Sequence, residues 1–209
     1  MSKTTSSAEL YKEYMKKVGD RFDLFKLLRN EFNIESAIYP GSHIDITPSF
    51  FYRRTIYIDM FKKAKKFFAK PDLLDYIAKN KKYENKPSLK FYFKDYREEI
   101  KEITADFDLL ISLYAGIVSK YCKKYLRKEG LLIVNNSHAD AGMAKLDPDF
   151  RFFGVIYHSN RKLYFNQKNL GSYFIPKKER EINPEKLEKT MKGIVYTKTA
   201  NFYLFKKIN

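Results

Sequence analysis

The residues best suited to chemistry in this sequence come directly after short apolar segments. The first segment, 36–39, runs into a Pro-Gly-Ser turn at 40–42, and the segment 55–58 ends in Asp59, 18 residues along the chain from Gly41. A glycine lets the backbone approach a ligand closely, and an acid at this spacing can accept two hydrogen bonds from a ribose diol. The pattern indicates a nucleotide site, although Asp59 could instead cap the helix that follows it.

Further polar residues follow the third and fourth apolar segments. Asp95 and Tyr96 come after the segment 89–93. Asp95 could contact an adenine amino group or cap the next helix, and the sequence does not choose between these roles. Tyr114 follows the segment 107–113 and could stack on a planar substrate or pack against the protein.

A second polar group begins at the end of the apolar segment 131–135. It contains Asn135, Asn136 and His138. The two asparagines could bind the polar groups of a ligand, or they could hold a turn at a strand end. Because histidine titrates near neutral pH, His138 could act as a base or substrate contact. It could also bond to the backbone at a helix N-terminus.

Strands that alternate with helices are expected to position these groups. Apolar strands joined by helical crossovers form a parallel sheet, and ligands bind beyond the carboxyl ends of such strands. The hydrophobic pattern predicts strands over 36–39, 55–58, 89–93, 107–113 and 131–135 and helices over 7–32 with a break near Gly19, 61–69, 72–79 and 115–128.

The stretch 115–128 has a clear amphipathic pattern. Its apolar residues recur at helical spacing, its lysines and arginine occupy the other face, and Gly130 is placed to end it. Cys122 lies on the apolar side, which favours a buried structural thiol over a nucleophile.

The C-terminal part has a different pattern, because strands follow strands. Segments 151–157, 162–165 and 201–206 are predicted strands, so the sheet is expected to close with antiparallel pairing. The expected fold class is therefore α/β: a mostly parallel Rossmann-like sheet with an antiparallel C-terminal hairpin and helices on both faces. We expect a helical extension over 1–19 and a single domain over 20–209.

Composition limits the choice of partners and location. The 209 residues include 41 basic and 25 acidic ones, a net charge of +16, which favours nucleic acid or another anionic partner. A solvated lysine-rich surface is the alternative. No apolar run reaches the ~20 residues of a membrane span, no signal sequence is evident, and one cysteine excludes an internal disulfide. We expect a cytoplasmic protein without a metal cluster, and the oligomeric state stays open.

Taken together, these segments resemble the class I S-adenosylmethionine-dependent methyltransferases. The resemblance covers roughly residues 20–209 and is one of architecture more than of motif. It includes a glycine turn after strand one, an acid ending strand two and a Lys-Asp pair ending strand three. "DLLISLYAG", "EGLLIVNN" and a late "FYLFKK" strand complete it. The resemblance implies methyl transfer from S-adenosylmethionine to an acceptor that the sequence does not name.

The resemblance also assigns roles to the residues at the strand ends. The methionine part of the cofactor would lie along Tyr39, Pro40, Gly41 and Ser42, the ribose at Asp59 followed by Met60, the adenine at Asp95 and Tyr96, and a pocket wall along 113–116 with Tyr114. His138, Asn135 and Asn136 would then stand on the acceptor side.

The sequence departs from the family in its glycine-rich loop, which usually has two or three glycines. Here only Gly41 is present, and Pro40 removes a backbone donor. "LYAG" replaces the Asn/Asp-Pro-Pro-aromatic sequence of amino-methylating members, which argues against methylation of adenine N6 in DNA. The alternatives are a nucleic-acid-binding protein with a degenerate cofactor site on the same scaffold, and an enzyme that uses NAD.

Overall fold

The computed structural model describes residues 5–179 and 182–209. The chain divides into two compact units. The first unit ends at Asp95, and the second begins at Tyr96. None of the helices in the described residues is both long and apolar enough to cross a bilayer.

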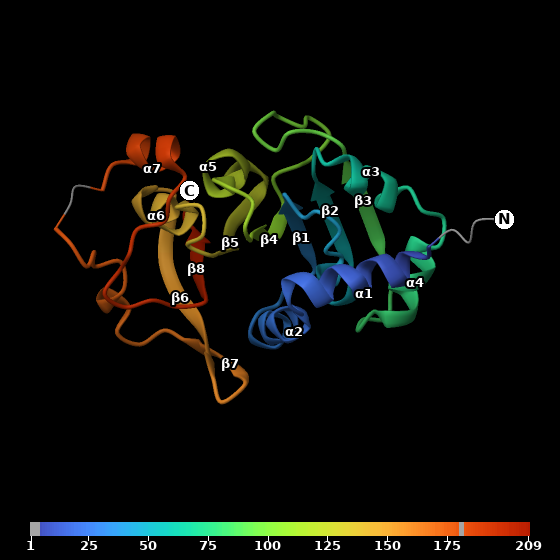
Figure 1. Ribbon diagram of the computed structural model, residues 1–209, viewed down its shortest axis with the longest axis horizontal. Helices are drawn as coiled ribbons and strands as arrows, with labels where there is room; N and C mark the ends of the chain where they lie inside the picture. Colours follow the sequence, from blue (N-terminus) through green and yellow to red (C-terminus); the bar gives the residue numbers. More distant parts are fainter. Residues whose placement is uncertain (1–4, 180–181) are drawn as a thin grey trace. The chain divides into compact units, whose positions relative to one another are not determined.

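The first unit contains a three-stranded parallel sheet with the strand order β3-β2-β1 (Figure 1). Ile38 of β1 pairs with Ile56 of β2, and Ile58 at the end of β2 pairs with Tyr92 at the end of β3. The three strands therefore finish at the same edge. The elements are α1 (Ser7–Val18), α2 (Phe22–Glu31), β1 (Ser36–Pro40), the 3-10 turn η1 (Thr47–Phe50), β2 (Arg54–Ile58), α3 (Lys62–Phe68), α4 (Leu73–Asn80) and β3 (Ser88–Tyr92).

Local sequence signals fix the ends of α1. The Ser6 side chain accepts a hydrogen bond from the Glu9 backbone, and the Glu9 carboxylate accepts one from Ser6 N, which together form a capping box. Gly19, at φ +88°, ends the helix in a conformation that favours glycine. The predicted break near Gly19 is thus confirmed. Asp72 also accepts hydrogen bonds from the backbone and hydroxyl of Ser7, both at 2.8 Å, which ties α4 to α1.

In the described part of the second unit there are five strands, in the order β4-β5-β8-β6-β7. β4 and β5 are parallel, whereas β8 runs antiparallel to both β5 and β6, and β6 and β7 form a hairpin. The predicted antiparallel ending is confirmed. The elements are β4 (Phe107–Ser112), α5 (Val118–Cys122), η2 (Lys123–Tyr125), β5 (Leu126–Val134), α6 (Asp140–Leu146), β6 (Phe150–Ser159), β7 (Lys162–Asn166), η3 (Leu170–Ser172), α7 (Pro184–Thr190) and β8 (Phe202–Lys207).

The helix predicted over 115–128 is wrong in its length. The α-helix spans only Val118–Cys122, a 3-10 turn follows, and β5 begins at Leu126. Leu126 is fully buried and pairs with Phe107 of β4, so the apolar end of the helical pattern belongs to the sheet. Cys122 is buried within α5, as the sequence predicts.

Candidate functional site

The turn after β1 is held against the end of β2. Gly41, at φ +66°, donates its backbone hydrogen bond to the Ile58 carbonyl at 2.7 Å. Pro40 and Ser42 are buried, and His43 has φ +51°, a left-handed conformation that glycine adopts most easily. The turn therefore has two residues in the left-handed conformation, Gly41 and His43, although only the first is a glycine.

Asp59, directly after β2, binds this turn. Its Oδ2 accepts a hydrogen bond from His43 N at 2.7 Å, and its Oδ1 accepts one from Phe61 N at 2.7 Å. The residue is half-buried and is not the N-cap of α3, because Phe61 occupies that position. An ionised carboxylate offers about four acceptor positions. Two backbone bonds thus leave room for two further donors.

Two apolar side chains stand exposed beside Asp59. Met60 is 63% exposed and Phe61 is 45% exposed, both at the edge where β2 ends. Exposed large apolar groups next to a carboxylate with spare acceptor capacity form a surface suited to a ligand that has a planar ring and a polar part beside it.

The His43 ring lies between two aromatic rings of the same unit. Its centroid is 4.7 Å from that of Tyr14 on α1 and 4.9 Å from that of Phe61. Burial lowers the pKa of His43 below its ordinary value, against the opposing effect of Asp59, so the ring is neutral at physiological pH. Its buried Nδ1 has no hydrogen-bond partner among the described residues.

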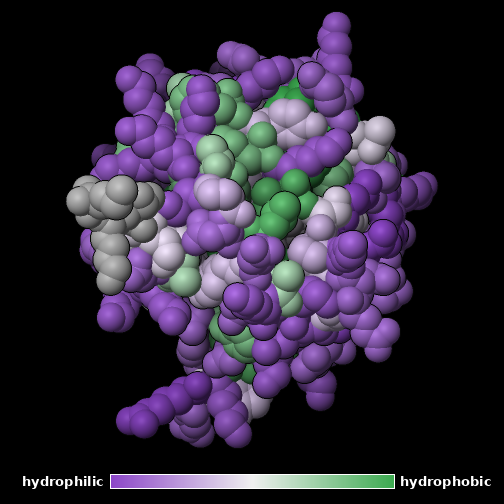
Figure 2. Space-filling model, turned by 90° about the vertical axis from the view of Figure 1, so that its right-hand side faces the viewer, coloured by the Kyte–Doolittle hydropathy of each residue, from purple (hydrophilic) through white to green (hydrophobic). Residues whose placement is uncertain are grey.

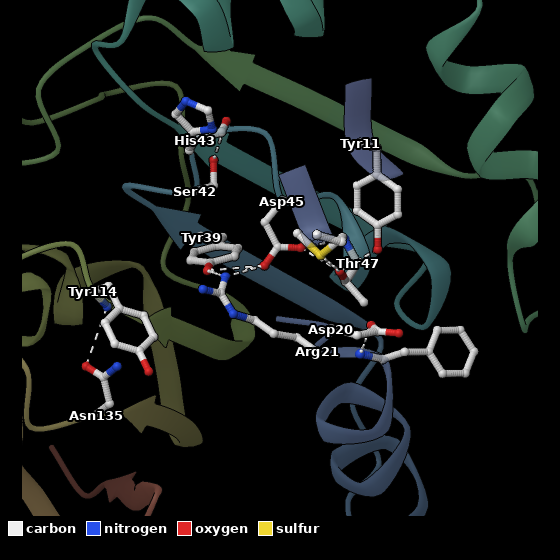
Figure 3. Close-up of polar contacts among 12 residues, drawn as sticks. Tyr11, Asp20, Arg21, Tyr39, Ser42, His43, Asp45, Thr47, Tyr114 and Asn135 are labelled. Carbon is white, nitrogen blue, oxygen red and sulfur yellow. Dashed lines mark hydrogen bonds and ion pairs between the residues drawn. The ribbon is translucent and has the colours of Figure 1, made fainter. Parts of the chain in front are cut away.

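A buried polar cluster supports the turn from below (Figure 3). Arg21 donates to Asp45 at 2.5 Å and to the Tyr39 hydroxyl at 2.8 Å. Asp45 is fully buried and also accepts from the backbone and hydroxyl of Thr47. The Tyr39 side chain is therefore engaged inside the protein, and Tyr39 can line a ligand only through its backbone.

In the second unit, residues after β4 and β5 come together. Asn135 Oδ1 accepts a hydrogen bond from Tyr114 N at 3.5 Å (Figure 3). It also accepts one from the Ser137 hydroxyl at 2.8 Å. The Ser137 hydroxyl lies 3.0 Å from Nδ1 of His138. Tyr114 is 60% exposed. The structure thus joins three of the residues that the sequence marked in this half of the chain.

Two amide atoms in this group are buried without a partner among the described residues. They are Nδ2 of Asn135, a residue that is 5% exposed, and Oδ1 of Asn136. Asn136 uses its Nδ2 to donate to the Ile194 carbonyl at 2.8 Å. Because buried polar atoms are normally satisfied, an unpaired donor and an unpaired acceptor here indicate a place for a polar ligand.

Asp140, at the start of α6, was not identified from the sequence. It is fully buried and accepts hydrogen bonds from the hydroxyls of Ser112 and Ser119, both at 2.5 Å, and from the backbone of Val118 and Ser119. Burial raises the pKa of Asp140 to about 6, although these hydrogen bonds oppose the rise. The carboxyl group connects the end of β4 with the first turns of α5 and α6.

The predicted adenine contacts occupy different surroundings. Asp95 is half-buried at the end of the first unit. The Tyr96 hydroxyl donates to the Ala115 carbonyl at 2.8 Å, and it lies close to Gly116, which has φ +99°. Tyr96 therefore fixes the loop after β4. The described residues contain no cluster of three histidine, cysteine or acidic side chains that could hold a metal ion.

Comparison with known proteins bears on the fold. No protein-family profile and no curated protein matches the sequence. Solved structures do match: TomG from Streptomyces achromogenes is an O-methyltransferase of tomaymycin synthesis, solved with S-adenosylmethionine. It is 11% identical, with a TM-score of 0.53 over 99% of this chain and 92% of TomG. A protein from Klebsiella pneumoniae assigned as an O-methyltransferase is 11% identical, with a TM-score of 0.51 over 100% of this chain and 93% of its own.

The chain has the class I methyltransferase fold. This confirms the fold class and the resemblance that the order of glycine turn, acid and late antiparallel strand predicts. At these identities the likeness concerns the fold, and the roles of individual residues rest on the geometry described above.

Proposed function

We propose that the protein is a methyltransferase that uses S-adenosylmethionine, bound at the turn after β1 and at Asp59. The observation that carries the proposal is the position of Asp59. It lies beside a glycine turn at the ends of two paired parallel strands, and the described residues use only half of its acceptor capacity. The solved neighbour TomG, which shares the fold, binds the same cofactor.

We assign each part of the cofactor to a surface of the first unit. The ribose diol would donate to Asp59, and the adenine plane would lie on the exposed side chains of Met60 and Phe61. The methionine part would pass along the backbone of Tyr39 to Ser42, where Gly41 permits close approach. Asp95 stays a predicted contact for the adenine amino group.

Calorimetric titration with S-adenosylmethionine tests the cofactor site. The Asp59→Asn variant should bind about 10- to 150-fold more weakly, because a hydrogen bond to a charged group is worth about 1.5–3 kcal/mol. Asp75→Asn is the matched control, since Asp75 is an exposed carboxylate on α4 of the same unit. Absence of binding by the unaltered protein, or equal binding by Asp59→Asn, would contradict the proposal.

We assign the acceptor side to Asn135, Asn136 and His138. The unpaired amide atoms of the two asparagines support this assignment, because an acceptor with both a donor and an acceptor group would satisfy them. TomG is an O-methyltransferase, and the Klebsiella pneumoniae neighbour is assigned as one. A hydroxyl acceptor must lose its proton as the sulfonium becomes a thioether. His138 would take that proton.

Transfer of tritium from labelled S-adenosylmethionine tests the acceptor side. Small-molecule and RNA fractions of a cell extract serve as the acceptor pool, and the labelled product is counted. His138→Ala should lower incorporation by about 10²-fold or more with unchanged cofactor affinity. His158→Ala is the control, because His158 is an exposed residue of β6. Equal incorporation by both variants would remove His138 from the mechanism.

A further inference from the structure

The basic residues of the first unit are concentrated in one segment. From Lys62 to Lys94 the sequence has eleven basic and three acidic residues, whereas the rest of the chain up to Asp95 has nine of each. This basic segment, 62–94, comprises α3, α4 and β3 and their connections. It therefore carries all of the net positive charge of its unit.

Within the described residues, no side chain of the basic segment forms an ion pair. The second unit differs, because Lys120 pairs with Glu188 at 2.6 Å and Lys123 pairs with Asp147 at 2.7 Å. Like charges crowded without counter-charges repel one another and attract an anion. The unpaired lysines therefore indicate an external anionic partner rather than a neutralised surface.

An apolar groove runs through the basic segment. It has a volume of about 490 Å³, and α3, α4 and β3 line it. Leu74 and Phe93 are 50% and 40% exposed at the groove, and the Lys65 ammonium lies 4.8 Å from the centre of the Phe93 ring. Phe68 and Phe91 stack in parallel within it, at 4.4 Å. Figure 2 views the face on which these elements lie and shows apolar side chains gathered among hydrophilic ones.

We propose that this groove binds single-stranded nucleic acid, with bases against its aromatic rings and phosphates on the surrounding lysines. Charged grooves with aromatic platforms bind single strands because every base has a face that can stack. A duplex hides those faces. A flat anionic bilayer would meet the lysines but not the half-buried rings of Phe68 and Phe91 in the concave groove.

Fluorescence anisotropy with a labelled oligouridylate of about 12 nucleotides tests the proposal. Binding should weaken linearly with the logarithm of salt concentration, with a slope of about −0.7 for each phosphate neutralised. A duplex of equal length and phosphatidylserine vesicles are the competitors. No binding at low salt, or preferential binding to the duplex or the vesicles, would overturn the proposal.

A triple variant locates the contact. Lys65→Gln, Lys66→Gln and Lys70→Gln together should flatten the salt slope by about 2, as three phosphate contacts are lost. The matched control changes three exposed lysines of the second unit, Lys177, Lys178 and Lys186, to glutamine. The net charge falls equally, and the slope should stay unchanged. Equal slopes for the two triple variants would place the binding elsewhere.

Phe93→Ala separates stacking from charge. It should weaken binding roughly 5- to 150-fold, the range for loss of one stacked base, without changing the salt slope. An unchanged affinity would rule out stacking on this ring. Cofactor titration is performed without nucleic acid, so this inference and the proposed methyltransferase function fail or stand independently.

Discussion

The buried carboxyl group of Asp140 should make the stability of this protein depend on pH in an unusual direction. Its pKa is raised to about 6 in the folded chain, against 3.8 as its ordinary value, chiefly because burial disfavours the charged form. The folded state thus holds the proton more tightly than the unfolded state. The stabilising contribution is complete below pH 3.8 and is lost as the pH rises through 6.

The Asp140→Asn variant isolates this effect. An amide oxygen can accept the bonds that Val118 N and Ser112 Oγ now make to Oδ2, and the amide nitrogen can donate to Ser119 Oγ. The amide therefore imitates the protonated acid and does not ionise. Two pKa units correspond to about 3 kcal/mol, of which about 2 kcal/mol falls between pH 4.5 and 7.5.

Urea denaturation of both proteins from pH 4.5 to 7.5 measures the effect. The free energy of unfolding of Asp140→Asn, minus that of the unaltered protein, should rise by about 2 kcal/mol across this range. Asp149→Asn is the control, because bonds from Lys123 and Asn209 hold the pKa of Asp149 below its ordinary value of 3.8. This carboxyl group therefore titrates below the measured pH range, and the difference for Asp149→Asn should stay nearly constant. A constant difference for Asp140→Asn would refute the reasoning from burial.

Two further predictions concern the stability of the loops around the candidate site. Arg21→Ala should lower the free energy of unfolding, measured by urea denaturation, by about 3–5 kcal/mol, because it leaves Asp45 buried without its ion-pair partner. Lys17→Ala breaks an exposed ion pair and should lower the same free energy by no more than about 1 kcal/mol. Gly116→Ala should lower the melting temperature more than Gly19→Ala. Both glycines have positive φ, but only at Gly116 would a Cβ meet another group, the Tyr96 hydroxyl at 2.6 Å, and equal shifts would show that backbone strain alone matters.

Much of the fold could be predicted from hydrophobic periodicity. The strands β1, β2, β3 and β4 lie within one or two residues of their predicted positions, since each is a short apolar segment that ends in turn residues. The prediction of a single helix over 115–128 failed for a physical reason. Leu126 fits the apolar stripe of a helix, and it fits the first position of a buried strand equally well. Only its pairing with Phe107 of β4 shows that it belongs to the strand.

The candidate site could be predicted only in outline. Asp59 could be singled out as a candidate because its spacing from Gly41 and its place after an apolar segment are local features of the chain. The partners of Asp140 could not be predicted, because Ser112 and Ser119 lie 28 and 21 residues away from it along the chain. Nor does any local pattern show that Arg21 reaches Asp45 from the start of α2.

The sequence by itself determined the order of the strands along the chain, the acid after β2, the small turn after β1 and the excess of positive charge. These properties are set by neighbours in the chain, where periodicity and turn chemistry act. Only the tertiary structure decided which groups donate hydrogen bonds to the Asp59 carboxylate and that the Asp140 carboxyl group is removed from water. It also decided which lysines of the described residues form no ion pair. Desolvation and pairing depend on groups that folding brings together from distant positions, and no local pattern records them.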